Sequence, residues 1–216
     1  MSARPRCIVV VGAGTNVGKT HVACALASAL VRRGEPVTAK KPIESGYEAE
    51  GSDAARLAAA AGHPLIAPRY ALAEPVSPHR AARHEGLALE EVELVRFCAS
   101  ATGTLVETAG GLLSPLSPSL TNLDLTVALA PTHVVLVAAN RLGALHDVRA
   151  CQLALAARGL TALVVLSAPP EADAATHHNG AELALLGWAP RVFEFPRAEA
   201  HSPATLAAAD ALAAAL

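Results

Sequence analysis

The chain alternates short, continuous apolar runs with longer segments that are rich in Ala and Leu. Six of the apolar runs have the composition of β-strands, and they lie at 7–12, 36–39, 104–107, 133–138, 162–167 and 191–195. Strands that are apolar at successive positions are typical of a parallel sheet that is covered on both faces. The pattern therefore predicts an α/β fold, with a mostly parallel sheet and helices on both of its faces.

Two segments between these runs show the apolar spacing of a helix that packs with one face. The first segment contains Val22, Leu26, Ala29 and Leu30, and the second contains Leu145, Val148, Gln152 and Leu155. An Ala-rich stretch from 203 to 216 predicts a final helix. Proline-rich pieces at 64–78 and 114–118 interrupt the alternation, but neither is long enough for an interdomain linker. We therefore expect residues 1–216 to form one domain.

The composition narrows the possible functions. A chain of 216 residues that is 52% hydrophobic can bury a sizeable core. Its net charge of −2 and its 3% aromatic content provide neither a basic stripe nor a stacking platform, so we expect no nucleic-acid partner. We also expect no membrane association and a cytoplasmic location, because the sequence shows neither an apolar stretch near 20 residues nor a signal-peptide cleavage site.

The cysteines and lysines are sparse. Four cysteines are widely separated with no C-x-x-C spacing, which predicts buried thiols rather than a zinc site or a disulfide framework. Lysines account for only three of the 17 Lys and Arg residues, namely Lys19, Lys40 and Lys41. A lysine ammonium is a compact point charge, and an arginine guanidinium does not replace it where the cation must bind a single oxygen atom. For Lys40, a chance surface position is the alternative.

A glycine-rich segment, GAGTNVGKT, lies between the first predicted strand and the first predicted helix, which is the context of a phosphate-binding loop. In such a loop, backbone N–H groups face an anion, Lys19 reaches the β- and γ-phosphates, and the Thr20 hydroxyl can bind Mg²⁺. The spacing departs from the strict G-x4-G-K-[ST] pattern, because Ala13 stands where that pattern has glycine. A glycine-rich turn without a ligand is the alternative. The predicted nucleotide contacts here are Gly14, Thr15, Asn16, Val17, Gly18, Lys19, Thr20 and His21.

A magnesium site also requires carboxylates, because Mg²⁺ is a hard cation that takes oxygen ligands. Glu107 ends a predicted strand, so its side chain should emerge at the carboxyl edge of the sheet, where open α/β folds bind ligands. The expected nucleotide contacts continue after this strand with Thr108, Ala109 and Gly110. Asp53 is a second acidic candidate, although at this position either Ser52 or Asp53 could instead cap a helix.

Six segments together resemble the dethiobiotin synthetase family of P-loop NTPases, and the resemblance covers nearly the whole chain. These segments are GAGTNVGKT, KKPIESG, GSDAARL, LAEPVSPHRAARHEG, VETAGGLLSPLS and RLGALHD, and they occur in the family's order. The resemblance implies a P-loop NTPase-like three-layer domain. It also implies that Asp53 binds Mg²⁺ together with Thr20 and Glu107.

The activity implied by the resemblance is ATP-dependent closure of a cyclic urea. CO₂ adds to one amine of 7,8-diaminononanoate to give a carbamate, ATP phosphorylates the carbamate, and the second amine closes the ring as phosphate leaves. Every intermediate is anionic, so cationic groups that position phosphate and carbamate oxygens would carry the catalysis. The resemblance assigns this catalytic role to Lys41, with Lys19 and Thr15, and it places Ser45 against the diamine.

The resemblance further implies a homodimer whose substrate lies across the subunit interface. The segment RLGALHD would then begin a helix whose N-terminal amides receive the substrate carboxylate from the partner subunit. The substrate contacts in this segment would be Gly143, Ala144, Leu145 and His146. An ordinary helix start is the alternative.

Two positions depart from the family pattern, and the first of them concerns the nucleotide base. Family members often carry an Asn after the fifth strand that contacts adenine, whereas this chain has Ser167. Thr108 stands where the family usually has glycine. The family's other base-contacting segment corresponds to Pro196, Arg197 and Ala198.

Three other classes of protein share such a loop. A partitioning-type ATPase acts as a switch through a protein partner, but its signature lysine would fall at Gly14. An amide-forming ligase of the cobyrinate synthase type adds a glutaminase domain, for which this chain is too short. A nucleotide-binding module without catalytic activity is the third alternative.

Overall fold

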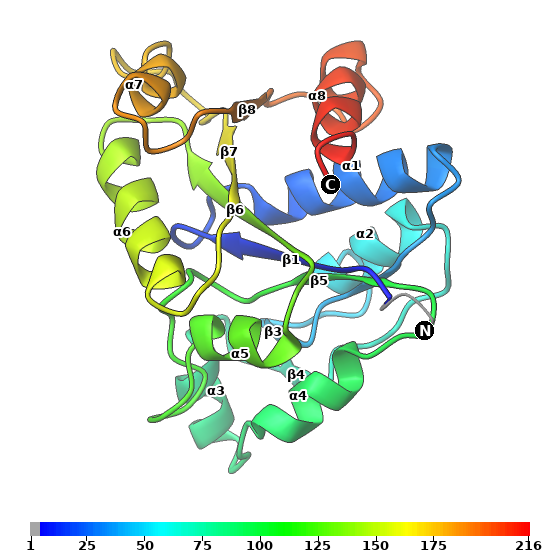
Figure 1. The fold of residues 1–216 in the computed structure, drawn as a ribbon. Coiled ribbons are helices and arrows are strands. Elements are labelled where there is room, and N and C mark those ends of the chain that lie inside the picture. The colour runs from blue at the N-terminus through cyan, green and yellow to red at the C-terminus, as the bar shows by residue number, and fades with distance from the viewer. Residues whose placement is uncertain (1–4) are drawn as a thin grey trace.

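A computed structural model describes residues 5–216, and its centre is a six-stranded sheet (Figure 1). All five strand pairs are parallel, and the strand order is β2-β5-β1-β6-β7-β8. The strands are β1 (Cys7–Gly12), β2 (Thr38–Lys40), β5 (Thr104–Glu107), β6 (His133–Ala139), β7 (Leu163–Ser167) and β8 (Val192–Phe195). Each of the six apolar runs forms one strand, and the predicted parallel sheet is confirmed.

Both faces of the sheet are covered, and β1 shows the reason. Its successive side chains point to opposite faces. Ile8 and Val10 pack in one core with residues of the helices α1 (Lys19–Arg32) and α8 (Pro203–Ala213). Val9 and Val11 pack in the other core, with residues of α5 (Asn122–Leu129) and α6 (Ala144–Ala156). Figure 1 shows α1 and α8 together on one face of the sheet. The predicted three-layer arrangement is therefore confirmed.

The predicted helical faces agree with the structure in most positions. Val22, Leu26, Ala29 and Leu30 are all fully buried in α1. Val148 and Leu155 are buried in α6, whereas Leu145 and Gln152 are only half-buried. The final helix ends at Ala213, before the helix end that the sequence predicted at residue 216. Within residues 5–216, no helix combines the length and the apolar composition that a membrane span requires.

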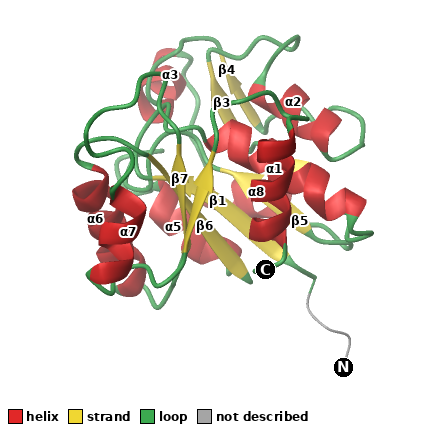
Figure 2. Cartoon of the chain, turned by 90° about the horizontal axis from the view of Figure 1, so that it is seen from above, coloured by secondary structure: helices red, strands yellow, loops and turns green. Residues whose placement is uncertain are grey.

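A second, two-stranded parallel sheet is the main element that the apolar pattern does not predict. It pairs β3 (Ile43–Ser45) with β4 (Tyr70–Leu72). Figure 2 shows it between α3 (Pro78–His84) and α2 (Asp53–Ala60). Each strand has only three residues, and β4 lies inside the proline-rich piece at 64–78. The remaining helices are α4 (Glu91–Cys98) and α7 (Asn179–Leu185).

Lys40 has a structural role. Its Nζ atom donates hydrogen bonds to the carbonyl oxygens of Phe97, at 2.6 Å, and Ala99, at 2.8 Å. It also lies 5.4 Å from the centroid of the Phe97 ring. A lysine ammonium near the last carbonyls of a helix stabilises that helix end. Lys40 therefore ties the edge strand β2 to the end of α4, and its position is not a matter of chance.

The cysteines agree only partly with the prediction of buried thiols. Cys98 and Cys151 are buried, whereas Cys7 and Cys24 are half-buried. Burial raises the pKa of the Cys98 thiol to about 12. Cys98 is therefore held in its unreactive thiol form at neutral pH.

Asp124 completes a capping box at the start of α5 and should stabilise the fold. Its carboxylate accepts hydrogen bonds from the Thr121 amide, at 2.9 Å, and from Arg158, at 2.7 Å. Hydrogen bonds from Thr121 and Arg158 lower the pKa of Asp124 from 3.8 to about 2. Because the folded-state pKa is depressed, the stabilisation is present above pH 3.8 and is lost as the pH falls toward about 2.

We predict that Asp124→Asn lowers the Tm by about 2–4 °C at neutral pH, since losing a helix cap typically costs about 1 kcal/mol. The difference between variant and wild type should shrink as the pH falls below 4. Thermal melts followed by circular dichroism between pH 7 and pH 3 measure both quantities. A Tm difference that stays constant down to pH 3 would show that the carboxylate charge contributes nothing.

Candidate active site

A cavity of about 830 Å³ opens at the carboxyl ends of β1 and β5. In parallel α/β sheets, this edge is where ligands bind. The lining residues come from the glycine-rich loop, α1, β3, α2, β5, the segments after β2, β5 and β8, and the segment that leads into α3. They are Thr15, Asn16, Gly18, Lys19, Thr20, His21, Lys41, Glu44, Ser45, Asp53, Arg56, Pro75, Val76, Ser77, Pro78, Glu107, Ala109, Gly110, Ser114 and Arg197.

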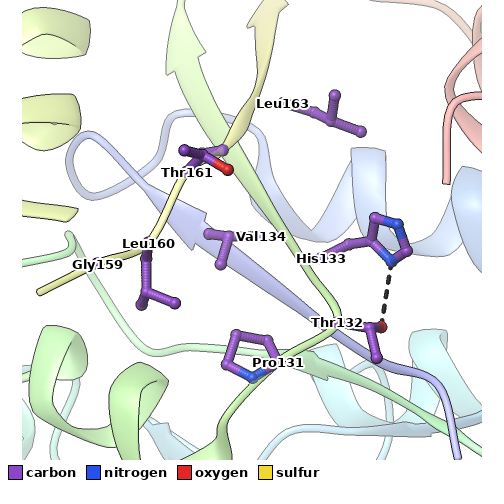
Figure 3. A pocket seen from close by; sticks show the side chains of 9 residues that line it. Pro131, Thr132, His133, Val134, Gly159, Leu160, Thr161 and Leu163 are labelled. Carbon is purple, nitrogen blue, oxygen red and sulfur yellow. Dashed lines mark hydrogen bonds between the residues drawn. The ribbon is translucent and has the colours of Figure 1, made fainter. Parts of the chain in front are cut away.

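A smaller cavity, of about 340 Å³, lies at the opposite edge of the sheet, where β6 and β7 begin (Figure 3). Its walls are formed by residues 131–134 and 159–163. The polar interaction drawn in Figure 3 joins His133 Nδ1 and Thr132 Oγ1, at 3.1 Å. This cavity is lined by no lysine, arginine or carboxylate, so the charged cavity is the one equipped to hold an anionic substrate.

The glycine-rich loop folds tightly around the lysine that follows it. Gly18 has a φ of 93°, and a Cβ atom there would lie 2.4 Å from Ser167 Oγ. A Cβ atom on Gly12 would lie 2.7 Å from the carbonyl oxygen of Gly14. Any other residue at these two positions would therefore force the loop away from β7 or open its turn. The loop keeps its backbone amides near the start of α1, where an anion is favoured.

Lys19 projects into this loop. Its Nζ atom donates to the Gly14 carbonyl at 3.3 Å, and the residue is only 7% exposed. Burial, together with the positive charge of Lys41, lowers the pKa of Lys19 to about 8. The ammonium has only this one weak hydrogen bond within the described chain. It is therefore positioned to donate a stronger hydrogen bond to a phosphate oxygen.

Three charged groups meet at the floor of the cavity. Lys41 Nζ lies 2.5 Å from Glu107 Oε1 and 3.1 Å from Asp53 Oδ2. The Thr20 hydroxyl donates to the same Glu107 oxygen at 2.8 Å. Glu107 is fully buried and Lys41 is 4% exposed. An ammonium, two carboxylates and a hydroxyl thus share a space that is largely shielded from water.

The ionised states of this cluster depend on one another. Burial lowers the pKa of the Lys41 ammonium, but the charges of Glu107 and Asp53 outweigh burial, so the net pKa is raised. Burial also opposes ionisation of Asp53, but the charges of Lys41 and Arg56 outweigh it and lower its pKa. Lys41 and Asp53 are therefore both charged at neutral pH.

The cluster has the composition of a magnesium site. Glu107 Oε2 is buried and has no hydrogen-bond partner within residues 5–216. Its partner oxygen and Asp53 already hold one cation, the Lys41 ammonium. Two carboxylates and a hydroxyl are oxygen donors of the kind that Mg²⁺ prefers, and water supplies its remaining ligands. The residues present therefore fit Mg²⁺.

The start of α2 shows why Asp53 can face the cavity. Ser52 is the N-cap residue, and its hydroxyl accepts a hydrogen bond from the Ala55 amide at 3.0 Å. Since Ser52 caps the helix, the Asp53 side chain is left for Lys41 and for Arg56, at 2.5 Å. Of the two residues that could cap this helix, it is Ser52 that does so.

The residues expected near the base lie at one end of the site. Ser167 is buried at the end of β7, and it packs against Gly18 without lining the cavity. His21 Nε2 is 3.1 Å from the carbonyl oxygen of Pro196, which ties the segment after β8 to the start of α1. Arg197 lines the cavity directly. The structure therefore brings the 196–198 segment next to the loop.

Some expected contacts do not line the cavity in the described chain. Thr108 is fully buried, and its hydroxyl donates to the carbonyl oxygen of Val10 inside the sheet. Val17 packs in the core next to α1. The others outside the lining are Gly14, Ser167, Pro196, Ala198, Gly143, Ala144, Leu145 and His146.

Several lining residues were not singled out from the sequence. They are Glu44, Arg56, Pro75, Val76, Ser77, Pro78 and Ser114. Most of them lie inside the segments KPIESG, LAEPVSPH and GGLLSPL, which carried the family resemblance. Their membership of those segments is the signal that could have identified them, because their residue types alone do not place them in a site.

The segment 143–146 begins α6, with Gly143 at the N-cap in a left-handed conformation at φ 95°. The Ala144 amide donates to Arg141 O, and the Asp147 amide donates to Gly143 O. Within residues 5–216, the amides of Leu145 and His146 have no hydrogen-bond acceptor. Leu142, directly before this turn, is 75% exposed.

Comparison with known proteins shows which family the chain belongs to. Residues 6–203 match the family model described as an AAA domain. The chain is 42% identical to the ATP-dependent dethiobiotin synthetase BioD of Caulobacter sp. (strain K31), over 93% of this chain and 92% of that protein. It is 39% identical to the protein of the same name from Anaeromyxobacter dehalogenans (strain 2CP-C), over 89% of this chain and 95% of that one.

Solved structures show the same fold at greater distance. A ParA family ATPase from Chlorobium tepidum TLS superposes with a TM-score of 0.57 at 13% identity, over 99% of this chain and 93% of that one. This similarity shows that the chain has the P-loop NTPase-like fold. At 13% identity it carries no information about activity.

The Lys41 ammonium, which Asp53 and Glu107 share, should contribute to the stability of the fold. We expect Lys41→Met to destabilise the ligand-free protein by about 3–5 kcal/mol, because it leaves the buried Glu107 carboxylate without its cation, while Asp53 keeps only Arg56. Added Mg²⁺ should raise the Tm of this variant more than that of the wild type, since the metal replaces the lost charge.

Lys40→Met is the matched control, because it removes the neighbouring ammonium from two carbonyl oxygens and leaves the carboxylates untouched. Thermal melts with and without Mg²⁺ make the comparison. An equal response of both variants to the metal would contradict a cation site at Lys41.

Proposed function

Because the chain belongs to the ATP-dependent dethiobiotin synthetase family, we propose that it closes the cyclic urea of dethiobiotin from 7,8-diaminononanoate, CO₂ and ATP. The products are dethiobiotin, ADP and phosphate. The observation that carries the proposal is the position of the Lys41, Glu107 and Asp53 cluster directly beside the phosphate loop. Such a cluster supplies the charges that a carbamate and a triphosphate need when they meet.

The proposed ligase is a single domain that spans residues 1–216. Support comes from the family match over 6–203 and from a relative of nearly equal length. Residues 1–4 lie outside the part of the chain that the structure describes.

In this proposal, the triphosphate lies along the glycine-rich loop, with Lys19 against the β- and γ-phosphates. The tight loop and the weakly bonded Lys19 ammonium support this placement. Thr15, which lines the cavity, adds a hydroxyl donor. Arg197 and the neighbouring 196–198 segment approach the base.

Mg²⁺ would be held by Thr20, Asp53 and Glu107. When bound there, the metal neutralises charge on the β- and γ-phosphate oxygens. The Lys41 ammonium, released from the shared carboxylates, would then hold the carbamate and the transferring phosphoryl group in line. Positioning of this kind accounts for most of the catalysis in phosphoryl transfer.

The diamine would lie between Lys41 and β3. Ser45 supports this placement, because its hydroxyl is buried, has no partner within the described chain and belongs to a residue that lines the cavity. A buried hydroxyl without a partner is costly, and a substrate amine would satisfy it. Carbamate formation requires one neutral amine, and the neighbouring ammonium of Lys41 favours loss of an amine proton.

The active unit is proposed to be a cytoplasmic homodimer. The unpaired amides at the start of α6 support a partner-facing anion site for the substrate carboxylate. Leu142 and Leu113, which are 75% and 57% exposed, provide apolar surface that a second subunit would cover.

A partitioning-type ATPase that acts through a protein partner is the second function that the fold allows. It shares the fold with the ParA family structure at 13% identity. Its signature lysine is replaced by Gly14, and no other feature of the site favours it.

Product analysis tests the proposed function. The protein is mixed with ATP, Mg²⁺, bicarbonate and 7,8-diaminononanoate, and the products are identified by mass spectrometry. We expect the cyclic urea to form together with ADP. ATP hydrolysis without the cyclic urea, and independent of the diamine, would favour the partitioning-type reading.

Lys19→Ala should abolish product formation with little change in Tm, because it removes the phosphate-binding ammonium from the loop without breaking a strong internal hydrogen bond. A loss of at least about a hundredfold in kcat/KM is expected, comparable to removal of a preorganised charge in other sites. Lys40→Ala serves as the control with near-normal kinetics. Normal turnover of Lys19→Ala would contradict the assignment.

Selectivity for the base should be weak. An amide that reads a base discriminates by about 1–3 kcal/mol, whereas Ser167 packs its hydroxyl against Gly18, outside the cavity lining. We expect kcat/KM values for ATP, CTP and GTP to agree within about tenfold. A preference for ATP above about a hundredfold would show that the 196–198 segment reads the base instead.

A further inference from the structure

Glu44 lies at the centre of β3 and is a buried carboxylate with two backbone partners. Its Oε1 atom accepts a hydrogen bond from the Asp53 amide at 2.7 Å, and its Oε2 atom accepts one from the Ala54 amide at 3.1 Å. The residue is only 8% exposed and borders the charged cavity. Glu44 therefore binds the start of α2, whose first residue, Asp53, is nine residues later in the sequence.

These bonds complete the N-terminus of α2. A helix leaves its first four amides without intrahelical partners. Glu44 accepts the amides of Asp53 and Ala54, and the Ser52 hydroxyl accepts that of Ala55, so these three amides find partners outside the helical ladder. The helix start is thus held from two directions, and one of them is the small β3–β4 sheet.

The position of Asp53 follows from this clamp. Its backbone amide is held by Glu44, while its side chain reaches Lys41 at 3.1 Å, beside Glu107. Asp53 is the only one of the two carboxylates that does not come from the central sheet, since Glu107 ends β5. A shift of α2 would therefore move one carboxylate of the cluster and leave the other in place.

We propose that Glu44 is a positioning residue that sets the distance between the Asp53 and Glu107 carboxylates and thereby the affinity of the metal site. The proposal rests on the function proposed above, in which these carboxylates hold Mg²⁺. It also explains why a carboxylate is buried at this position in β3. Two amides need two acceptors, and a carboxylate supplies both while favouring the positive end of the helix.

The isosteric change Glu44→Gln separates positioning from shape. A glutamine side chain has one acceptor oxygen, and its NH₂ group would face one of the two amides. We expect the start of α2 to move away from β3, and Asp53 to move with it. Changes to such supporting groups typically weaken metal affinity by about 10- to 100-fold.

Isothermal titration calorimetry measures Mn²⁺ binding to the complete chain in the presence of a non-hydrolysable ATP analogue. This readout does not depend on product formation, so a failure of the proposed ligase activity would be seen separately, in the wild-type product assay. We expect Glu44→Gln to weaken Mn²⁺ binding at least about tenfold.

Asp124→Asn is the matched control, because it removes an acidic group that caps α5 outside the cavity lining. It should bind Mn²⁺ within about twofold of wild type while losing stability through its cap. In the Asp53→Asn background, adding Glu44→Gln should cost little further affinity, since Glu44 acts through Asp53. Wild-type affinity in Glu44→Gln, equal losses in the control, or a full additional loss in the double variant would each overturn the proposal.

Discussion

The buried ammonium of Lys41 is the group on which the site depends. It lies between Glu107 at 2.5 Å and Asp53 at 3.1 Å, in a place where isolated charges would be strongly penalised. Only the mutual pairing makes two carboxylates tolerable so close together. The arrangement keeps an acidic oxygen site intact without a metal, and the same cation is available to phosphate or carbamate oxygens. In the proposed function, the stability of the ligand-free protein and its preparation for the reaction would both depend on this contact.

The fold brings this contact together from separate parts of the chain. Parallel strands end at one edge of the sheet, so Glu107 at the end of β5 lies beside the loop that follows β1. Lys41 comes directly after the edge strand β2. Asp53 comes from α2, whose start is held by Glu44 of the small sheet. The small sheet therefore contributes to the cavity wall, since β3 brings both Glu44 and Ser45 there.

The sequence predicts the central sheet well, because its strands are buried on both faces and appear as unbroken apolar runs. It does not predict β3 and β4, because the charged Glu44 interrupts the apolar pattern of β3 and because β4 lies inside a proline-rich piece. The role of Lys40 was equally hidden, because its partners Phe97 and Ala99 lie 57 and 59 residues away. Motifs identified the loop and Glu107. The placement of Asp53 depends on its backbone hydrogen bond to Glu44, nine residues earlier in the chain, which the apolar pattern does not reveal.

The most direct test of this account is a crystal structure of the protein with Mg²⁺ and a non-hydrolysable ATP analogue. The account predicts the metal on oxygens of Thr20, Asp53 and Glu107, with the Lys41 ammonium moved from between the carboxylates to a phosphate oxygen. An ammonium that stays bound to Glu107 and Asp53, with the metal held elsewhere, would contradict it. Such a result would make the cluster a purely structural ion pair.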